Sequence, residues 1–576
     1  MTNKQIIDVL HEISELLELK GENKFKIRAY QKLSSFLSGY EKQLADVYAE
    51  EGKKGLMKVP NLGEGIAKKI AELIDTGRLE YIDDLKKSLP EGVLTFLEIP
   101  GMGPKTAYLL GDKFRLKTVS SLEKFLRSGK LRNEKGFGEK AEEKLLKGIE
   151  MYKKGRQRML MGEAYYIADR IIKKLKKKHK ISMAKPAGSL RRMEDTVGDI
   201  DILAVSTDSV KIMETFASMD IVENVIAKGE KKTSVYVAPG IQADLRVFEK
   251  QSFGAAMQYF TGSREHNVIL REIAVKKGLT LNEYGLFKGK KKIAGDAEEE
   301  IYRALGMQYI PPELRSGAGE TDLALKKAIP PLLEEKDIKG DFHIHSVYSD
   351  GENGIDEIVE EAKKRGYKYI AITDHSQSLR IAGGLAEENL RKQAKEIDRI
   401  NKREKDFHVF KGSEVDILED GSLDYPDDIL KELDIVIGAV HSRFKMSRDV
   451  MTERILKAMD NKYLGIIAHI SGRLINMREP YELDYPRIFE KAAGGEIAIE
   501  INANPERLDI ADIYAKEAVK AGVTLAISTD AHSTETMDFI RFGAGKARKA
   551  MAGKSDVLNA RTAAEIKKWV KKRRSI

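Results

Sequence analysis

Apolar and polar positions follow three different patterns along the chain, and each predicts a different kind of element. Over residues 1–150, short amphipathic segments alternate with Gly-x-Gly turns, which predicts short helices. From about Ile181, apolar and polar residues alternate with period two in DIDILAVS, TSVYVAP and IQADLRVF, as in strands. From Gly340 onward, a short apolar strand, a polar loop and an amphipathic helix repeat to the end. This repeat predicts a parallel sheet or barrel.

The regions between these patterns carry turn residues. A helical and turn-rich stretch runs to about Arg315, and the Pro and Gly content of IPPELRSGAGE predicts a linker after it. A length of 576 residues exceeds what one hydrophobic core supports, so we expect several domains. The middle of the chain should be an α+β domain and the last part an α/β domain.

Composition limits the possible chemistry. The chain has no cysteine, which excludes disulfides, iron–sulfur clusters and thiolate zinc sites, so any metal must bind His, Asp or Glu. No run of 18 apolar residues occurs, and MTNKQIIDVLHEI lacks the layout of a signal peptide. We therefore expect a cytoplasmic protein without a membrane partner.

Charge is unevenly placed. Residues 1–315 hold 57 Lys and Arg against 45 Asp and Glu, a net +12, whereas the remainder holds 43 against 46, a net −3. Residues 151–180 alone carry 11 basic and 2 acidic residues. Such a run by itself is as often a solvated helix face as a ligand surface. The asymmetry of the whole chain predicts a polyanionic partner for the first half.

Three glycine pairs in the basic half each precede a predicted helix. The pairs are Gly63 with Gly65, Gly101 with Gly103, and, as a weaker copy, Gly136 with Gly138. Glycine lets the backbone turn tightly and approach a phosphate, and free N–H groups at the next helix start point toward it. One such turn is usually only a turn, but three favour hairpins that grip the DNA backbone without reading bases. They resemble helix-hairpin-helix motifs, and Lys105, in the closest match, is expected to contact DNA with them.

The segment PAGSLRRMEDTVGDIDIL predicts a second kind of site. Asp199 and Asp201 project from one strand face because side chains alternate with period two. Carboxylates held so close repel each other unless cations lie between them, and two Mg²⁺ or Mn²⁺ ions roughly 4 Å apart would activate an attacking hydroxyl and stabilise a leaving pyrophosphate. Asp244, in IQADLRV, is the expected third carboxylate. An Asp-x-Asp alone is usually a solvated pair, but the preceding GSLRR and Gly198 favour a site here.

Residues 1 to about 315 resemble a family X DNA polymerase, related to DNA polymerase beta. Tyr259-Phe-Thr-Gly-Ser263 is similar to the family's motif for the incoming nucleotide, Asn267 follows at the expected spacing, and LTLNEY matches the next segment. The resemblance implies that the three aspartates are catalytic metal ligands. It also implies a set of nucleotide-binding residues: Gly188, Ser189 and Arg192 for the triphosphate, Tyr259, Phe260 and Gly262 for the sugar, and Asn267.

Two positions qualify the resemblance. Arg264 stands where DNA polymerase beta has an acidic residue near the base, which puts base contacts in doubt. Lys69 falls where the family's deoxyribose-phosphate lyase lysine lies. A Schiff-base lysine needs a lowered pKa, to which a neighbour such as Lys68 would contribute. Simple phosphate binding by Lys69 remains the alternative.

The last part of the chain carries histidines and carboxylates where predicted strands end. The expected metal ligands are His343, His345, Asp350, His375, Glu414, His441, His469, Asp530 and His532. A lone His at a strand end is usually structural, but repeated placement at the C-terminal ends of parallel strands allows these groups to converge. Nine ligands exceed the need of one ion, so we predict two or three ions, with Glu414 as the bridge. Imidazole with carboxylate favours Zn²⁺, Mn²⁺ or Fe²⁺ over Mg²⁺, and the cluster suits phosphoester hydrolysis.

This set resembles a PHP (polymerase and histidinol phosphatase) domain that covers residues 339 to about 570. Arg443 and Arg473, a short way past their histidines, are expected to hold the substrate phosphate. His408 lies within a strand-like run, and we interpret it as structural, together with His11, His179 and His266.

These resemblances together predict a multidomain α+β and α/β protein with helical helix-hairpin-helix domains, a nucleotidyltransferase palm and a distorted (β/α)7 PHP barrel. The expected domains are an N-terminal helical domain (1–85), a fingers-like domain (86–150), the palm (151–250), a thumb-like subdomain (251–315), a linker (316–338) and the PHP domain (339–576).

The expected function is DNA-directed synthesis that fills short gaps in base excision repair. The PHP domain would act as a 3′–5′ exonuclease, an abasic-site endonuclease, or both. Partners would be gapped or primer-template DNA and deoxynucleoside triphosphates, with the protein a monomer. Two alternatives stay open: a nuclease whose front half is a DNA-binding module with a weak palm, and a PHP part that is a small-molecule phosphatase or a structural metal-holding domain.

Overall fold

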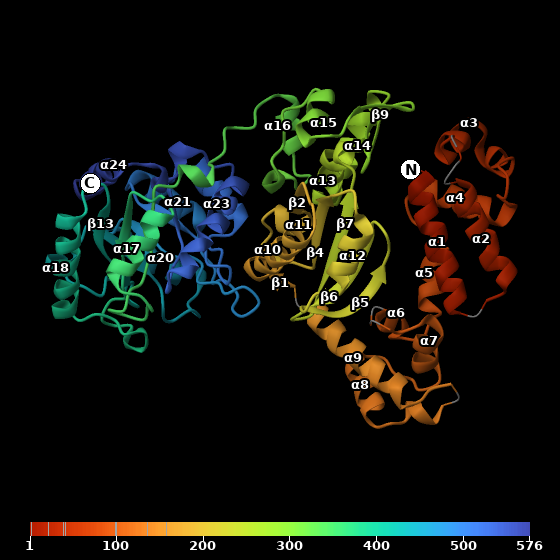
Figure 1. Ribbon diagram of the computed structural model, residues 1–576, viewed down its shortest axis with the longest axis horizontal. Helices are drawn as coiled ribbons and strands as arrows, with labels where there is room; N and C mark the ends of the chain where they lie inside the picture. Colours follow the sequence, from red (N-terminus) through yellow and green to blue (C-terminus); the bar gives the residue numbers. More distant parts are fainter. Residues whose placement is uncertain are drawn as a thin grey trace. The chain divides into compact units, whose positions relative to one another are not determined.

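The computed structural model describes residues 1–576 except 2, 21, 38, 39, 41, 98, 100, 135 and 157. Pro100 and Lys135, which belong to the second and third glycine motifs, therefore lie outside the described residues. The chain divides into two compact units, Met1–Gln157 and Arg158–Ile576, each considered by itself here (Figure 1).

The first unit is helical, as its amphipathic pattern predicts. Its helices are α1 (Asn3–Leu19), α2 (Lys24–Leu37), α3 (Leu44–Met57), α4 (Glu64–Thr76), α5 (Glu80–Lys87), α6 (Val93–Leu97), α7 (Pro104–Asp112), α8 (Val119–Arg127) and α9 (Glu139–Arg156). Helix α1 packs against α2, α5 and α7. One apolar core, which includes Ile6, Leu17, Ala71 and Leu110, runs through the whole unit. The predicted boundary at residue 85 therefore separates two parts that share this core.

The second unit begins with an α+β layer. Its elements are β1 (Met159–Leu160), α10 (Met161–Lys178), β2 (Met183–Pro186), α11 (Gly188–Arg191), β3 (Thr196–Val197), β4 (Asp199–Val205), α12 (Ser209–Ala217), β5 (Val222–Lys228), β6 (Lys232–Val237) and β7 (Ile241–Phe248). Five strands form a sheet in the order β2-β4-β7-β6-β5, in which β4 and β7 are parallel. Ile200 and Ile202 face a core shared with α10 and α12, while Leu203 and Val205 face the core on the opposite side. Because both faces are covered, most of β4 is buried.

A smaller helical and hairpin region follows. Its elements are α13 (Phe253–Thr261), α14 (Arg264–Lys276), β8 (Thr280–Asn282), β9 (Gly285–Lys288), β10 (Lys291–Ala294), α15 (Glu298–Ala304) and α16 (Glu320–Leu325). The segment predicted as a linker, 316–338, differs from that expectation because it is packed. Ala324 and Ile329 belong to the core of this region, and Leu333 and Ile338 belong to the core of the next domain. Its Pro and Gly residues form turns between buried side chains, a pattern that composition alone does not distinguish from a free linker.

The last part is a parallel barrel. Its elements are β11 (Gly340–Asp341), α17 (Ile355–Lys364), β12 (Tyr369–Ile372), α18 (Glu387–Arg403), β13 (His408–Asp416), α19 (Asp427–Leu430), β14 (Ile435–Ala439), α20 (Arg448–Met459), β15 (Ile466–Ile467), α21 (Tyr485–Gly494), β16 (Ala498–Asn502), α22 (Asp512–Lys520), β17 (Leu525–Ser528), α23 (Ile540–Lys549) and α24 (Ala563–Arg574). The strands pair in chain order from β11 to β17. A parallel bridge between Ile344 and Ala531 joins the two ends of the sheet.

Helices surround the barrel strands (Figure 1). Trp569 of α24 lies in a core with Phe342, Tyr369 and Phe410 inside the barrel. The predicted fold class, with helical N-terminal domains, a mixed sheet and a seven-stranded parallel barrel, is confirmed.

Short 3-10 helices complete the secondary structure. They are η1 (Leu131–Asn133), η2 (Lys250–Ser252), η3 (Pro312–Leu314), η4 (Glu335–Asp337), η5 (Arg380–Ala382), η6 (Glu535–Phe539), η7 (Lys554–Asp556) and η8 (Leu558–Ala560). None of the described helices combines the length and apolar character that crossing a bilayer requires.

Candidate active sites

The three predicted palm carboxylates come together on adjacent strands. Asp199 and Asp201 lie two positions apart on β4, and Asp201 pairs in register with Asp244 on the parallel strand β7. Period-two alternation places Asp199 and Asp201 on one face of the sheet, and the register puts Asp244 beside them. Asp244 is buried, at 4% exposed, whereas Asp199 is exposed. Sequence spacing predicted the first pair, while the third member depends on the sheet order.

An arginine lies between two of these carboxylates. Arg246 places one guanidinium nitrogen 3.0 Å from Asp201 Oδ1 and another 3.0 Å from Asp244 Oδ2. Its guanidinium carbon lies 4.5 Å from the centroid of the Phe260 ring. Lys232 Nζ adds a second contact to Asp244, at 3.1 Å. Two of the carboxylates therefore form ion pairs with Arg246 and Lys232, which is consistent with their proposed role as ligands of divalent cations.

The pKa values of the three aspartates shift in different directions. Burial and the charge of Asp199 raise the pKa of Asp201 to about 6, against the pull of Arg246. Burial and the charge of Asp244 also raise the pKa of Asp199. Burial alone would raise the pKa of Asp244 too, but hydrogen bonds from Gln242, Ser234 and Lys232 hold it below its usual value. Carboxylates that raise each other's pKa form a site with surplus negative charge, which a divalent cation would relieve.

The residues predicted to bind triphosphate lie next to this face. Gly188 begins α11 with φ +59°, and a Cβ built there would lie 2.8 Å from Asp201 Oδ2. The turn that carries Ser189 therefore lies directly against the carboxylate, which only glycine permits. Arg192 donates to the carbonyl of Thr261, at the end of α13, and its Nε lies 3.5 Å from Glu194 Oε1.

The residues predicted to meet the sugar and base lie on α13 and α14. Tyr259 and Phe260 are in the last turn of α13, and Gly262 follows with φ +70°. Asn267 donates from Nδ2 to the Tyr259 carbonyl at 2.7 Å and accepts from Gln258 Nε2 at 2.7 Å. Its amide therefore ties the two helices together. Arg264 is exposed at the start of α14.

The glycine pairs of the first unit precede helices as predicted. Gly63 and Gly103 are the residues at which α4 and α7 start. Gly138 accepts a helical hydrogen bond from Ala141 at the start of α9. Within the described residues, no heavy atom lies within 4 Å of a Cβ built at Gly63, Gly65, Gly103, Gly136 or Gly138. The space beside these five glycines is therefore open, as close approach by a phosphate would require. Lys105 is exposed beside the second pair.

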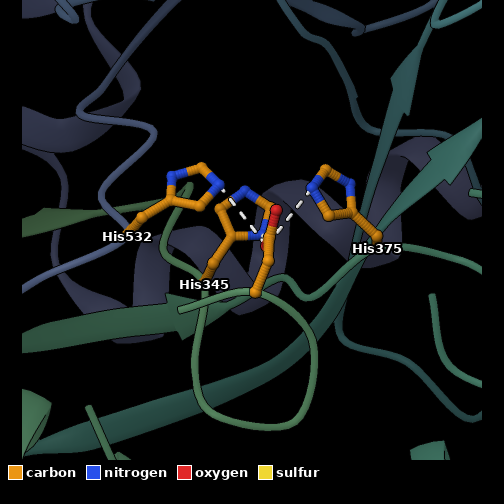
Figure 2. Close-up of side chains that lie close together, drawn as sticks. His345, His375 and His532 are labelled. Atoms are coloured by element: carbon orange, nitrogen blue, oxygen red, sulfur yellow. Dashed lines mark ion pairs between the residues drawn. The ribbon is translucent and has the colours of Figure 1, made fainter. Parts of the chain in front are cut away.

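The nine ligand candidates of the barrel converge at one end of its strands. Groups of ligand atoms within 4.8 Å of one another are formed by His345, Asp350, His375 and His532, by His343, His345 and Asp530, and by His375, Glu414 and His441. The ninth candidate, His469, has Nε2 at 2.8 Å from Glu414 Oε1. Figure 2 shows the rings of His345, His375 and His532 turned toward a common point. Asp350 Oδ1 lies 3.4 Å from His532 Nε2 and 3.5 Å from His375 Nε2.

Glu414 occupies the centre of the cluster. Its oxygens lie 2.7 Å from His375 Nδ1, 3.2 Å from His441 Nε2 and 3.5 Å from His343 Nε2. Glu414 was predicted at the end of a strand, and it lies within β13, which runs on to Asp416. A parallel bridge between His375 and Glu414 brings the ends of β12 and β13 together. This central position is the one that a bridging carboxylate would occupy.

A second layer of carboxylates orients the imidazoles. His343 Nδ1 lies 2.8 Å from Glu500 Oε1, and His441 Nδ1 lies 2.5 Å from Asp416 Oδ1. These contacts leave the opposite ring nitrogens turned toward the cluster. Among the described residues, the buried atoms His343 Nε2 and His345 Nδ1 form no hydrogen bond. Buried polar atoms left in this way, in a set of imidazoles and carboxylates, fit the binding of divalent metal ions. Sequence analysis missed Glu500 and Asp416, whose only local signal is a carboxylate at a strand end.

The pKa values of the cluster are strongly coupled to one another. Burial alone would lower the pKa of His375, but Glu414 and Asp350 raise it to about 10. Burial likewise opposes Glu414 and Asp416, which raise the pKa of His441 to about 9. Burial lowers the pKa of His345 to about 4, and its histidine neighbours act in the same direction. Metal binding would have to displace the protons that His375 and His441 hold.

Comparison with known proteins matches each region separately. A helix-hairpin-helix family model matches residues 1–79, a DNA polymerase beta thumb model matches 256–316, and a PHP domain model matches 341–504. A DNA polymerase/3′-5′ exonuclease PolX of Bacillus subtilis (strain 168) is 37% identical over 577 residues, covering 99% of this chain and 100% of the relative. The chain belongs to the family X DNA polymerases that carry a PHP domain.

Two further relatives match one part each. DNA polymerase lambda of Rattus norvegicus is 25% identical over 344 residues, which cover 54% of this chain and 56% of the relative. A probable phosphatase of Thermoanaerobacter sp. (strain X514) is 32% identical over 204 residues, which cover 33% of this chain and 78% of the relative. This family X polymerase is thus an enzyme that acts on DNA and deoxynucleoside triphosphates and carries a metal-dependent phosphoesterase domain.

The two arginines predicted for the PHP phosphate differ in their surroundings. Arg443 is exposed and pairs with Glu419 at 3.1 Å. Arg473 is 13% exposed and lies 3.0 Å from Asp195 of the palm. It also donates to the carbonyls of Arg507 and Leu508, so its donors are already occupied. The prediction for Arg473 rested only on its spacing from His469. Its partner Asp195 is 278 residues away in sequence, so spacing could not indicate this contact.

Arg507 is a residue that sequence analysis missed. Its Nε lies 3.3 Å from Asp530 Oδ2, beside the ligand cluster. It follows β16 in the sequence NANPERL, where no histidine marks the strand end. In this family X polymerase, Arg507 is therefore an arginine in direct contact with a predicted ligand of the barrel.

The predicted lyase lysine of this family X polymerase lies on α4. Lys69 Nζ is 4.3 Å from the centroid of the Tyr81 ring and 3.3 Å from the Gly65 carbonyl oxygen. Burial, followed by the charge of Lys26, lowers the pKa of Lys69. Lys68, which we expected to contribute, pairs with Glu64 at 3.0 Å instead. One helical residue apart, Lys68 and Lys69 point to different faces of α4.

Three of the four remaining histidines make structural contacts through their rings. His266 Nδ1 lies 2.7 Å from Glu320 Oε1, and its Nε2 lies 2.9 Å from Tyr302 Oη. His179 Nε2 lies 2.7 Å from Thr215 Oγ1. His408 packs edge-on against Phe410.

Proposed function

We propose that the palm of this family X polymerase fills short gaps during base excision repair by two-metal nucleotidyl transfer. The observation that carries the proposal is the register of β4 and β7, which pairs Asp201 with Asp244 on the strand that also holds Asp199. The approach of Gly188 to Asp201 supports it further. Bound Mg²⁺ or Mn²⁺ would supply activation of the primer hydroxyl and charge for the leaving pyrophosphate. Asp199, Asp201 and Asp244 would hold the ions, with Gly188, Ser189 and Arg192 positioning the triphosphate.

The proposal also assigns contacts to the nucleotide and to the DNA backbone. Tyr259, Phe260, Gly262 and Asn267 would form the sugar and base side of the nucleotide site. The glycine turns at 63–65, 101–103 and 136–138, with Lys105, would hold the DNA backbone on both sides of a gap. Contacts to phosphate weaken with salt, so gap binding should weaken as ionic strength rises.

We further propose that the PHP domain trims a 3′ end or cuts at an abasic site. Two or three Mn²⁺, Zn²⁺ or Fe²⁺ ions held by the nine ligands would supply an activated water and charge for the phosphoryl oxygens. Glu414 would bridge, Glu500 and Asp416 would hold the imidazoles in place, and Arg443 would reach the phosphate. The three groups of ligand atoms within 4.8 Å support this number of ions.

Paired variants test both proposals on DNA with a single-nucleotide gap. Asp244→Ala should lower primer extension at least about a hundredfold, because a metal ligand is lost, and should leave 3′ trimming unchanged. His343→Ala should do the reverse. Asp220→Ala, an exposed palm aspartate, and His408→Ala, on a barrel strand outside the cluster, are the matched controls.

Normal extension by Asp244→Ala would refute the palm assignment, and normal trimming by His343→Ala would refute the PHP assignment. Elemental analysis of the purified protein should find more than one transition-metal ion per chain. Sedimentation should find a monomer.

A phosphomonoesterase is the second candidate for the PHP domain, favoured by the probable phosphatase that matches this part of the chain. Turnover of p-nitrophenyl phosphate compared with a 3′-hydroxyl oligonucleotide distinguishes the two. Preference for the oligonucleotide by a factor above about a hundred in kcat/KM would support the nuclease.

Lys69 is our proposal for a deoxyribose-phosphate lyase. Its lowered pKa and its place above the Tyr81 ring support a nucleophilic amine. Borohydride should trap the protein covalently on a 5′-deoxyribose-phosphate end, and Lys69→Ala should lose the adduct while Lys68→Ala keeps it. Equal trapping by both variants would leave Lys69 as a phosphate-binding residue only.

A further inference from the structure

Six charged side chains from the palm and the PHP barrel meet inside the unit Arg158–Ile576. We call them the bridge cluster: Glu194, Asp195, Arg473, Asp512, Lys546 and Lys549. Asp195 lies 3.0 Å from Arg473 and also contacts Lys546, which in turn contacts Asp512. Lys549 lies 2.8 Å from Asp512 and 2.9 Å from Glu194. The cluster therefore forms one continuous network across the domain boundary.

The cations of the bridge cluster are buried by close packing, whereas Asp195, Asp512 and Glu194 are 30%, 31% and 38% exposed. The side chain of Lys546 is 0% exposed, Lys549 is 11% exposed and Arg473 is 13% exposed. Around it, a Cβ built at Gly545 would lie 2.7 Å from Met193, and one at Gly162 would lie 2.4 Å from Pro505. Three anions balance three cations. Removing one anion would leave buried cations uncompensated, so this geometry is strongly constrained.

On the palm side, the bridge cluster continues into the triphosphate turn. The Glu194 amide donates to the Ser189 carbonyl at 3.2 Å, and Glu194 Oε1 lies 3.5 Å from Arg192 Nε. Asp195 is the next residue, four positions before Asp199. Burial alone would raise the pKa of the Asp195 carboxyl, but the charges of Lys546 and Arg473 hold it below its usual value.

On the barrel side, Arg473 lies between two ligand-bearing loops. It follows His469 by four residues, and Gly472 donates back to the His469 carbonyl at 2.8 Å. Arg473 Nε donates to the Arg507 carbonyl at 2.7 Å, and the same guanidinium reaches the Leu508 carbonyl. Arg507 Nε lies 3.3 Å from Asp530. One guanidinium, held by Asp195, thus joins the loop of His469 to the loop that contacts Asp530.

We propose that Asp195, a palm residue, is a positioning residue for the PHP nuclease site. By orienting Arg473, it sets the spacing between the loops that carry His469 and contact Asp530. The nuclease geometry therefore depends on the polymerase domain, on the same segment that carries Ser189 and Arg192. This inference rests on the proposed metal-dependent nuclease function of the barrel.

The test uses the full-length protein with Asp195→Asn. Substitution of a residue that supports a metal ligand from outside the ligand set lowers metal affinity or activity by about tenfold to a hundredfold. We expect the kcat for 3′ trimming of a single-stranded oligonucleotide to fall about tenfold, with KM changed less than about twofold, because Asp195 acts through Arg473 and is outside the proposed DNA contacts. The number of transition-metal ions retained per chain after gel filtration should fall as well. Wild-type kcat together with wild-type metal content would overturn the proposal.

Glu313→Gln is the matched control. This substitution also removes a carboxylate that pairs across the domain boundary, since Glu313 lies 2.8 Å from Arg548 Nε. Its partner is Arg548, not a residue of the loop that follows His469 or of the loop that contacts Asp530. It should keep wild-type trimming and metal content. An equal loss in both variants would show that any weakening of the boundary suffices, and would overturn the specific role of Asp195.

Arg473→Lys keeps the test valid if Asp195→Asn does not fold. Lysine retains the charge opposite Asp195 but loses the forked donors to the carbonyls of residues 507 and 508. The same loss of kcat is expected, and an unchanged kcat would overturn the proposal. Where both single variants fold, the kcat of the double variant should be no lower than that of the more impaired single variant, because one residue acts through the other. Multiplying losses would argue that Asp195 does not act through Arg473.

Wild type and His343→Ala are measured alongside. If His343→Ala still trims, the proposed nuclease function itself fails. If His343→Ala is inactive while Asp195→Asn matches wild type, only the positioning role fails.

Discussion

At the residue scale, Glu298 shows how a buried acid is kept charged. Its oxygens lie 2.7 Å from Arg315 and 3.0 Å from Arg191, and Arg315 is completely buried. Burial alone would raise the pKa of Glu298, but the two arginines lower it from 4.5 to about 2. The charge therefore belongs to a group of three residues that joins the thumb-like region to Arg191 of the palm.

Glu298→Gln should destabilise the protein by about 3–5 kcal/mol, because it leaves buried Arg315 without its anion. A pKa lowered in the folded state contributes stability that is fully present above about 4.5 and is lost as pH falls through about 2. The difference between wild type and variant in urea unfolding should therefore be constant from about pH 5 to 8 and shrink below about 4.5. A difference that grows on acidification would contradict this assignment.

At the element scale, the turn before β4 depends on one glycine. Gly188 combines φ +59° with a Cβ position 2.8 Å from Asp201 Oδ2. The turn and the strand can come this close only without a side chain, because a methyl group would meet the carboxylate. The approach sets where Ser189 and Arg192, the proposed triphosphate residues, lie relative to the aspartates.

Gly188→Ala should therefore lower primer extension strongly while 3′ trimming by the barrel stays at the wild-type level. Gly289→Ala is the matched control, because Gly289 has the same φ of +59° with no described heavy atom within 4 Å of a Cβ. Both variants carry the backbone cost of about 1 kcal/mol for alanine at positive φ, but only the first displaces Asp201. Equal extension by the two variants would show that the close approach does not matter.

At the scale of the whole molecule, the palm and barrel share an apolar core. Leu508 and Phe542, from the barrel part of the chain, are 0% exposed within the core that also holds Ile200 and Ile202 of β4. Burying a large apolar side chain contributes roughly 1.5–3 kcal/mol. Side chains from the barrel part of the chain therefore complete the apolar core of the palm.

A fragment of residues 158–576 should be monomeric and cooperative in unfolding and should retain 3′ trimming, whereas a fragment of residues 339–576 should aggregate. The shorter fragment exposes Leu508 and Phe542 as part of an apolar patch. Size-exclusion chromatography and thermal unfolding of the two fragments check this. A monomeric 339–576 fragment with the same midpoint would show that the shared core is dispensable.

The sequence by itself determined what depends on local periodicity. Period-two spacing placed Asp199 and Asp201 on one face, and repeated strand ends predicted that His343, His375 and His441 would converge. Glycine pairs located helix starts because only local backbone geometry is involved. The need for a third carboxylate on a neighbouring strand predicted Asp244, the family resemblance implied the same residue, and the register of β4 and β7 is consistent with it.

Only the tertiary structure decided which distant groups meet. It placed Arg246 between two carboxylates, paired Arg473 with Asp195, and showed that residues of the predicted linker such as Leu333 are buried. Charged partners hundreds of residues apart leave no periodic trace in the chain, because their meeting depends on how domains pack and on which charges that packing buries. Periodicity therefore predicted the ligands of each site, and packing determined what supports them.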